Sequence, residues 1–251
     1  MQHSFDDLVT EAAAADVSGW DFSWLAGRAT EQRPPWGYQQ LLGARLSTVA
    51  AALDVQTGGG EVLGGLFHYP PTMVATESWP PNIAAATAAL HPRGIVVVAD
   101  PDEPPLPFGD EAFDLVSSRH PVTVWWVEIN RVLRRGGSYL GQHVGSRSNA
   151  ELYEFFLGRQ DDTLGRRHHD KEAAAAGATG LRVVDLQTAR LRVEFFDVGA
   201  VVYFLRKVLW TVPGFTVDRY RRRLRDLHDQ ICRDGSFTCH STRTLIEARK
   251  D

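Results

Sequence analysis

An apolar stretch that ends in an acidic residue and a glycine cluster is the part of this sequence best suited to ligand binding. Residues 51–55 are apolar except for Asp54, and Gly58, Gly59 and Gly60 follow shortly after. Glycines at such a turn let the backbone approach a nucleotide-like ligand more closely than side chains would permit. The pattern predicts a strand that leads into a ligand-binding loop, with Gln56 where such loops usually carry their first glycine.

A second acidic residue follows the next apolar stretch. Residues 72–76 have the composition of a strand, and Glu77 comes directly after them. A carboxylate in this position suits the two hydroxyl donors of a ribose. Together the two segments predict an adenosine-type cofactor across the first two strands of an α/β sheet.

The elements expected to position these residues alternate between strands and helices. The predicted strands are residues 49–55, 72–76, 95–99, 113–117, 138–143, 181–186 and 236–248. The connections between the first five are long enough for crossover helices. Helical spacing over residues 122–133 indicates that Trp125 and Trp126 anchor the core and do not stack on a ligand. We therefore predict an α/β fold with a doubly wound, mostly parallel, seven-stranded sheet, whose cofactor-binding core spans residues 49–145.

An N-terminal helical cap is expected over residues 1–48. Its first helix follows from the spacing of Phe5, Leu8, Val9 and Ala12. Beyond that helix the cap holds large amphipathic side chains without a clear period, Trp36 and Tyr38 among them. Such side chains suit the rigid walls of a pocket, so we expect Trp36 and Tyr38 to contact the substrate.

A helical lid is expected over residues 197–232, between the last two predicted strands. Two stretches of helical spacing there are separated by Pro213-Gly214. Ligands of open α/β folds bind at the carboxyl edge of the sheet, which this insertion would cover. We expect Tyr203 and Trp210 to favour an acceptor with apolar or aromatic surface, while other lid aromatics serve as core.

Composition excludes several classes of partner. The formal net charge is -4 and the pI is about 6.1, so the chain lacks the excess basic charge of a protein that grips nucleic acid. No apolar stretch approaches the ~20 residues of a membrane span. Met1–Asp7 has no basic region leading into an apolar core, so we expect a cytoplasmic protein. Cys232 and Cys239 are expected to be unpaired thiols.

A series of motifs, in order along most of the chain, resembles the class I S-adenosylmethionine-dependent methyltransferases. The motifs are residues 53–60, Glu77, Asp100, 106–108 with 113–116, and Glu128 followed by 131–137. The resemblance implies that the chain is a single methyltransferase domain over residues 1–251. It also implies a structural role for the 128–137 segment, in which Arg135 stands where the family often has proline.

The resemblance implies S-adenosylmethionine as cofactor and assigns residues to it. The loop of Asp54, Gln56, Thr57, Gly58 and Gly60 would approach the methionine part, and Glu77 would bind the ribose hydroxyls. Asp100 would face the adenine amino group, with Ser78 and Trp79 near the ring. Ser117, after the fourth strand, would lie at the edge that faces the cofactor. Arg28 would either bind the cofactor carboxylate or cover aromatic rings at the surface.

The reaction implied is methyl transfer to a small molecule by O- or N-methylation, such as that of a secondary metabolite. Alignment of the acceptor with the methyl group can supply much of the acceleration, and a base is needed when the acceptor must lose a proton. His120 follows the fourth strand and is the candidate base, its alternative role being packing or capping. His143 is a weaker candidate. His168 and His169 lack acidic or cysteine partners at ligand spacing, so no metal site is expected.

Two other functions remain open at this point. A nicotinamide dehydrogenase would also use Glu77 for a ribose, but the adjacent Gly58, Gly59 and Gly60 do not follow the G-x-G-x-x-G spacing. The second is a protein of the same fold that binds the cofactor or a small molecule without methylating. Gln56 supports this alternative, because a glutamine there should cost about 1 kcal/mol if the left-handed backbone region is required.

Overall fold

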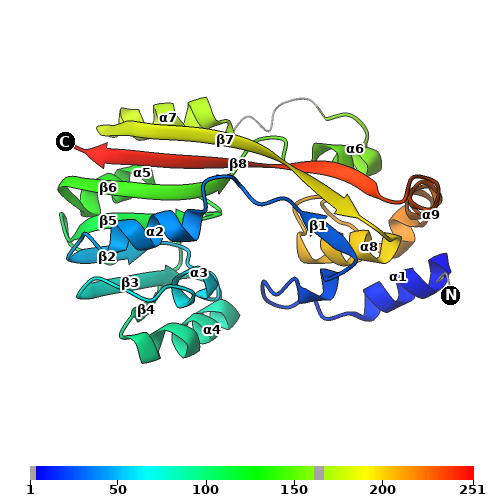
Figure 1. The fold of residues 1–251 in the computed structure, drawn as a ribbon, viewed down its shortest axis with the longest axis horizontal. Helices are drawn as coiled ribbons and strands as arrows, with labels where there is room; N and C mark the ends of the chain where they lie inside the picture. Colours follow the sequence, from blue (N-terminus) through cyan, green and yellow to red (C-terminus); the bar gives the residue numbers. More distant parts are fainter. Residues whose placement is uncertain (1–3, 161–166) are drawn as a thin grey trace. The chain divides into compact units, whose positions relative to one another are not determined.

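The structure is a computed structural model that describes residues 4–160 and 167–251, and it divides into two compact units (Figure 1). The first unit gathers Met1–Arg33, Arg147–Leu164 and Arg190–Thr242. The second gathers Pro34–Ser146, Gly165–Ala189 and Arg243–Asp251. The expectation about a leader in Met1–Asp7 rests in part on residues 1–3, which lie outside the described residues.

The second unit contains the predicted sheet. Its strands are β2 (Ala51–Asp54), β3 (Thr72–Glu77), β4 (Val96–Ala99), β5 (Phe113–Arg119), β6 (Leu133–Val144) and the adjoining parts of β7 (Leu181–Phe195) and β8 (Phe237–Lys250). The strand order is β7-β8-β6-β5-β2-β3-β4. Strands β2 to β6 pair in parallel, while β8 runs antiparallel to β6. The doubly wound, mostly parallel fold is thus confirmed.

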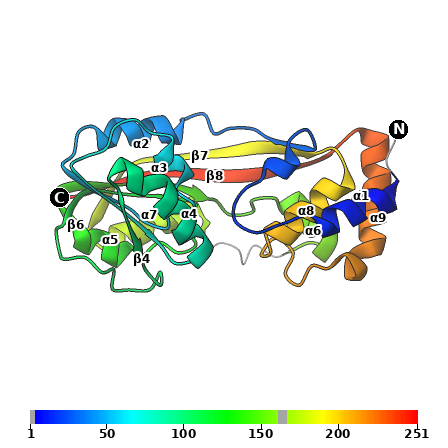
Figure 2. The same ribbon diagram turned by 90° about the horizontal axis from the view of Figure 1, so that it is seen from below.

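Successive residues of a strand point to opposite sides of a sheet, and the apolar residues on both sides of this sheet are covered by helices. They are α2 (Tyr38–Leu46), α3 (Glu61–Gly64), α4 (Pro80–Leu90), η2 (His91–Arg93), α5 (Trp126–Val132) and α7 (His169–Ala178). Ala52 and Leu115 pack with α2, α3 and α4, whereas Leu53 and Val116 pack with α5 and α7. Figure 2 shows α2 and α5 on opposite sides of the strands. Burial on both faces explains why β2 is buried along its whole length.

The first unit is mainly helical. It holds α1 (Phe5–Ala14), η1 (Ser23–Leu25), β1 (Ala29–Glu31), α6 (Ala150–Leu157), α8 (Val198–Lys207) and α9 (Val217–Asp234). The expected face of α1 packs against side chains of α6, α8 and α9 in one core. The helices predicted at both ends of the chain are confirmed. Whether they act as a cap and a lid stays a prediction.

Three differences from the sequence expectations have physical causes. An eighth strand, β1, is too short to show a period and pairs antiparallel with β7. Strand β6 begins at Leu133 and continues through Gly136-Gly137, beside a register shift in β5. Helix α5 begins only at Trp126, because the Gln56 side chain hydrogen-bonds the backbone of Val122 and Thr123 and holds that segment as a loop.

Among the described residues, no helix combines the length and the apolar character that crossing a bilayer requires. Cys232 is exposed on α9, Cys239 is buried in β8, and no disulfide joins them.

Candidate active site

The glycine loop follows β2 and turns sharply toward α3. Gln56, Gly58 and Gly60 all have left-handed backbone angles, with φ of 57°, 67° and 83°. A Cβ on Gly60 would press against the Leu90 side chain and the Ala86 backbone, so glycine is required there for two reasons. Gln56 thus adopts the left-handed region, in which a glutamine is disfavoured.

Glu77 is the last residue of β3, and its side chain hydrogen-bonds the glycine loop. One of its carboxylate oxygens accepts the Gly58 N–H at 2.8 Å, and the other accepts the N–H groups of Ser78 and Trp79 at 3.0 Å each. Glu77 is buried, while Ser78 and Trp79 are exposed. The oxygen that accepts from Gly58 keeps a further lone pair for a ligand hydroxyl, whereas the other already accepts two N–H groups.

Four carboxylates gather around the loop: Asp54, Glu77, Asp100 and Asp102. The pKa of Asp54 is raised to about 6, mainly by burial and also by the charge of Glu77, while hydrogen bonds from Ser117 and Thr57 act in the opposite direction. Burial also raises the pKa of Asp100 and of Asp102. In residues 4–160 and 167–251, none of the four forms an ion pair with lysine, arginine or histidine. The arrangement therefore favours a ligand that brings positive charge.

Ser117 supports this cluster from β5. Its hydroxyl donates to Asp54 Oδ1 at 2.5 Å, and the side chain is fully buried. Thr57 also hydrogen-bonds Asp54, and its backbone N–H donates to Thr76. Ser117 and Thr57 thus hold Asp54 in place at the end of β2.

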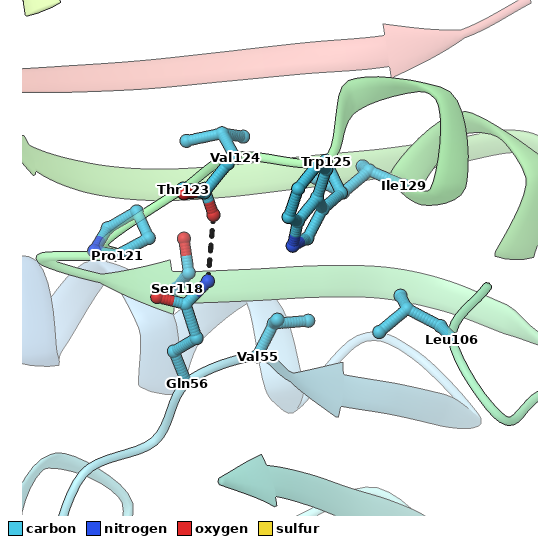
Figure 3. A pocket seen from close by; sticks show the side chains of 9 residues that line it. All are labelled: Val55, Gln56, Leu106, Ser118, Pro121, Thr123, Val124, Trp125 and Ile129. Atoms are coloured by element: carbon cyan, nitrogen blue, oxygen red, sulfur yellow. Dashed lines mark hydrogen bonds between the residues drawn. The ribbon is translucent and has the colours of Figure 1, made fainter. Parts of the chain in front are cut away.

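The Gln56 side chain crosses the cavity beside the loop (Figure 3). Its Nε2 donates to Asp102 Oδ1 at 2.9 Å and to the Thr123 carbonyl at 2.7 Å, the bond drawn as a dashed line. Its Oε1 accepts the Val122 N–H at 2.5 Å. The remaining cavity is about 10 Å³, enough for about one water. A ligand of cofactor size therefore requires this side chain to move.

Sequence reasoning missed several residues that line this cavity, among them Ser118, Leu106 and Trp125. Trp126 is a core anchor as predicted, but the expectation for Trp125 was wrong. Trp125 precedes α5, lines the cavity and donates its indole N–H to Asp102 at 3.2 Å. The helical spacing of the segment concealed this role.

His120 lies just after β5 and is linked through Gln142 to Trp36, one of the predicted substrate residues. Trp36 donates its indole N–H to Gln142 Oε1 at 2.7 Å, which leaves the Gln142 amide nitrogen to donate to His120 Nε2 at 3.1 Å. Burial, followed by the charge of Arg119, lowers the pKa of His120 well below its ordinary value. Tyr38 is buried and donates to the carbonyls of Ser118 and Leu140, which fixes α2 to the sheet.

Arg28, Tyr203 and Trp210 belong to the first unit. Arg28 pairs with Asp197 at 2.9 Å and Glu11 at 3.0 Å, and its guanidinium lies 3.9 Å from the centre of the Trp24 ring. These contacts agree with its alternative role, covering an aromatic ring. Tyr203 is buried and stacks on Trp24. Trp210 is 63% exposed and lies beside Trp20.

The statement that His168 and His169 lack an acidic partner was wrong. An Asp170 carboxylate oxygen lies 3.6 Å from a ring nitrogen of each histidine. The three could hold a metal ion by distance. Asp170 is exposed at the start of α7 and His168 caps that helix, which accounts for the cluster without an ion.

Comparison with known proteins agrees with this fold. Residues 53–141 match the methyltransferase domain family. A search of curated proteins found no match. A presumed methyltransferase from Bacillus halodurans has a similar structure, with 19% identity, a TM-score of 0.59, and coverage of 84% of this chain and 98% of that one.

Two further solved structures are similar at lower identity. The [4+2]-cyclase SpnF has 16% identity and a TM-score of 0.53, covering 97% of this chain and 92% of its own. Geranyl diphosphate methyltransferase, in complex with GPP and sinefungin, has 13% identity and a TM-score of 0.51, covering 85% and 77%. Residues 53–141 thus form a domain of the methyltransferase family, and the fold of the chain is that of the class I methyltransferases.

Proposed function

We propose that this protein is an S-adenosylmethionine-dependent methyltransferase that acts on a small molecule. The observation that carries the proposal is the cluster of four carboxylates without a cationic partner among the described residues, in a domain of the methyltransferase family. S-adenosylmethionine carries a sulfonium and an ammonium group, so it supplies the missing positive charge. The neighbour solved with sinefungin, an analogue of this cofactor, supports the same conclusion.

The residues of the loop suit this cofactor. Glu77 has a lone pair available for a ribose hydroxyl, Asp100 would accept from the adenine amino group, and the glycine loop would approach the methionine part. When bound, the cofactor would supply an electrophilic methyl group whose transfer depends mainly on alignment of the acceptor. Gln56 must leave the cavity for this, and Asp102 would then exchange its amide partner for the ligand.

The carboxylates also distinguish between cofactors. A nicotinamide dinucleotide would bring its anionic pyrophosphate to the glycine loop, where Asp54 at the end of β2 would repel it. The carboxylates therefore favour the sulfonium cofactor over the dehydrogenase alternative.

A protein of this fold without methyl transfer is the second candidate. Gln56 in the cavity favours it, as does the similarity to a [4+2]-cyclase, which is named for a reaction other than methyl transfer.

Calorimetric titration with S-adenosylmethionine, S-adenosylhomocysteine and NAD tests the proposal. We expect both sulfur compounds to bind and NAD not to. Glu77→Gln should weaken S-adenosylhomocysteine binding by about 1.5 to 3 kcal/mol, the range for hydrogen bonds to a charged group. Glu103→Gln, which changes an exposed carboxylate nearby, is the control and should bind like the parent. Binding of NAD alone would reject the proposal.

A further inference from the structure

A chain of four buried polar side chains leads from the cavity into the core of the second unit. Ser118 lines the cavity, and its hydroxyl lies 2.5 Å from the Tyr139 hydroxyl. The Tyr139 hydroxyl lies 2.7 Å from His143 Nε2, and His143 Nδ1 lies 2.7 Å from Glu172 Oε2. Each of the four side chains belongs to a buried residue.

Glu172 fixes the direction of these hydrogen bonds. With the Glu172 carboxylate as acceptor, His143 Nδ1 is the donor, and in that tautomer His143 Nε2 is an acceptor. Tyr139 then donates to Nε2, and Ser118 donates to the Tyr139 oxygen. The lone pairs of the Ser118 oxygen are left to accept a proton from a molecule in the cavity.

The surrounding structure is shaped to hold this chain. Tyr139 and His143 lie on the same face of β6 with Gly141 between them. A Cβ at Gly141 would collide with both Tyr139 Oη and His143 Nε2, so only glycine leaves room for their hydrogen bond. The Trp126 ring lies against both Tyr139 and His143 and screens them.

We propose that these four hydrogen-bonded side chains take up a proton from the methyl acceptor. The acceptor that this chemistry fits is a hydroxyl compound, which must lose a proton when it is methylated. The inference rests on the proposed function. Ser118 would touch the acceptor as the catalytic residue, while Tyr139, His143 and Glu172 would act through it as positioning residues.

Protons move along these four side chains in one direction, from Ser118 toward His143. The acceptor O–H proton passes to the Ser118 oxygen as the Ser118 proton passes to Tyr139 and the Tyr139 proton to His143 Nε2. The acceptor oxygen keeps the electron pair of its O–H bond and uses it for the bond to the methyl carbon, whose bond to sulfur breaks with its pair on sulfur. The imidazolium that results faces Glu172, which stabilises it.

His143 is the end point of the transfer for two reasons. Burial raises the pKa of Tyr139 well above its ordinary value, so a lasting tyrosinate is disfavoured. His143 Nε2 accepts from the Tyr139 hydroxyl, which can pass on its proton, whereas His120 Nε2 accepts from the Gln142 amide, which does not.

The first experiment determines the acceptor class. The parent is incubated with labelled S-adenosylmethionine and a library of small phenols, each paired with the aniline of the same skeleton. We expect methylation of phenols. Tyr139→Phe should lower phenol turnover about 100-fold, the usual contribution of general base catalysis, and should not lower aniline turnover, because a neutral amine needs no base. Tyr220→Phe, a buried tyrosine on α9, is the control and should match the parent. Methylation of anilines alone, or equal phenol turnover in Tyr139→Phe, would overturn the inference and leave the proposed function standing.

The second experiment needs no turnover. Nitrogen-15 spectra of labelled histidine, with the His143 signals identified by their loss in His143→Gln, report which ring nitrogen carries a proton. We expect a proton on Nδ1 and none on Nε2 at pH 7, and a shift of the Nε2 signal in Tyr139→Phe. A proton on Nε2 would overturn the inference, because the chain could not accept another. If the cofactor fails to bind, the proposed function fails, while these spectra still decide the direction of the chain.

Discussion

Replacing Gln56 with glycine should change the affinity for cofactor and the stability of the protein in opposite directions. In the parent, the Gln56 amide makes three hydrogen bonds across the cavity, to Asp102, Thr123 and Val122. Cofactor binding must break them, whereas in Gln56→Gly they are already absent. The left-handed strain at this position exists with and without ligand, so it cancels from the affinity.

The magnitudes follow from these contacts. Three hydrogen bonds are worth about 1 kcal/mol each to the ligand-free protein, and relief of the backbone strain returns about 1 kcal/mol. We therefore expect Gln56→Gly to lose about 2 kcal/mol of stability, a fall of roughly 4–8 °C in Tm for a chain of this size. Ligand and water satisfy part of what Gln56 releases, so the gain in affinity should be about 1–2 kcal/mol, or roughly 5- to 30-fold.

Calorimetric titration with S-adenosylhomocysteine and a thermal melt measure both effects. Glu111→Gly is a matched control, because Glu111 is exposed, also has a left-handed φ of 51° and does not line the cavity. It should leave the affinity unchanged.

Weaker binding in Gln56→Gly would refute the reasoning, because the glutamine would then be a ligand of the cofactor. Absence of binding to the parent at millimolar concentration, with binding restored in Gln56→Gly, would instead support the fold without methyl transfer.

Three further predictions follow from the site. Asp54 has a higher pKa in the folded than in the unfolded protein, so its bound proton stabilises the folded state below about pH 4. About 3 kcal/mol of this stabilisation is lost as the pH rises through about 6. Chemical denaturation should show this loss between pH 4 and 7 in the parent and not in Asp54→Asn. His120→Asn, which keeps a residue suited to the φ of 58°, should lower turnover less than tenfold because Gln142 occupies the His120 lone pair, and a loss of about 100-fold would restore His120 as the base. In denaturant melts, Tyr203→Ala should lose about 3–5 kcal/mol of stability, because Tyr203 is a buried aromatic residue, whereas replacing the exposed Trp210 with alanine should cost less than about 0.5 kcal/mol. If Trp210→Ala also leaves the acceptor preference unchanged, Trp210 is not a substrate residue.

The parallel strands were predictable because burial on both faces leaves continuous apolar stretches in the sequence. Residues 51–54 and 72–77 illustrate this, since each stretch ends at a carboxylate, Asp54 and Glu77, at the edge of the sheet. The three residues of β1 carry no such signal, because their pairing with β7 depends on chain about 160 residues away.

The loop carboxylates were predictable in part, and the cavity was not. Asp54 and Glu77 follow directly from strand ends, whereas Asp102 and Ser118 matter through partners that the local pattern does not specify. The glutamine at position 56 was recognised as unusual, but the groups it bonds lie 46 to 67 residues further on. One available signal was overlooked: Gly141 interrupts a buried strand, which indicates a close approach of other atoms.

The division of β8 between the two units has a consequence for synthesis of the protein on the ribosome. Residues 237–242 belong to the first unit and residues 243–250 to the second, where Arg243 to Arg249 pair with β6. The ribosome adds about 5–20 residues per second, so neither unit can be completed until this strand, near the end of the sequence, has been synthesised. Until then the edge of β6 presents unpaired backbone groups to other nascent chains. We therefore expect stalling or truncation before residue 237 to yield chains that depend on chaperones in both units at once.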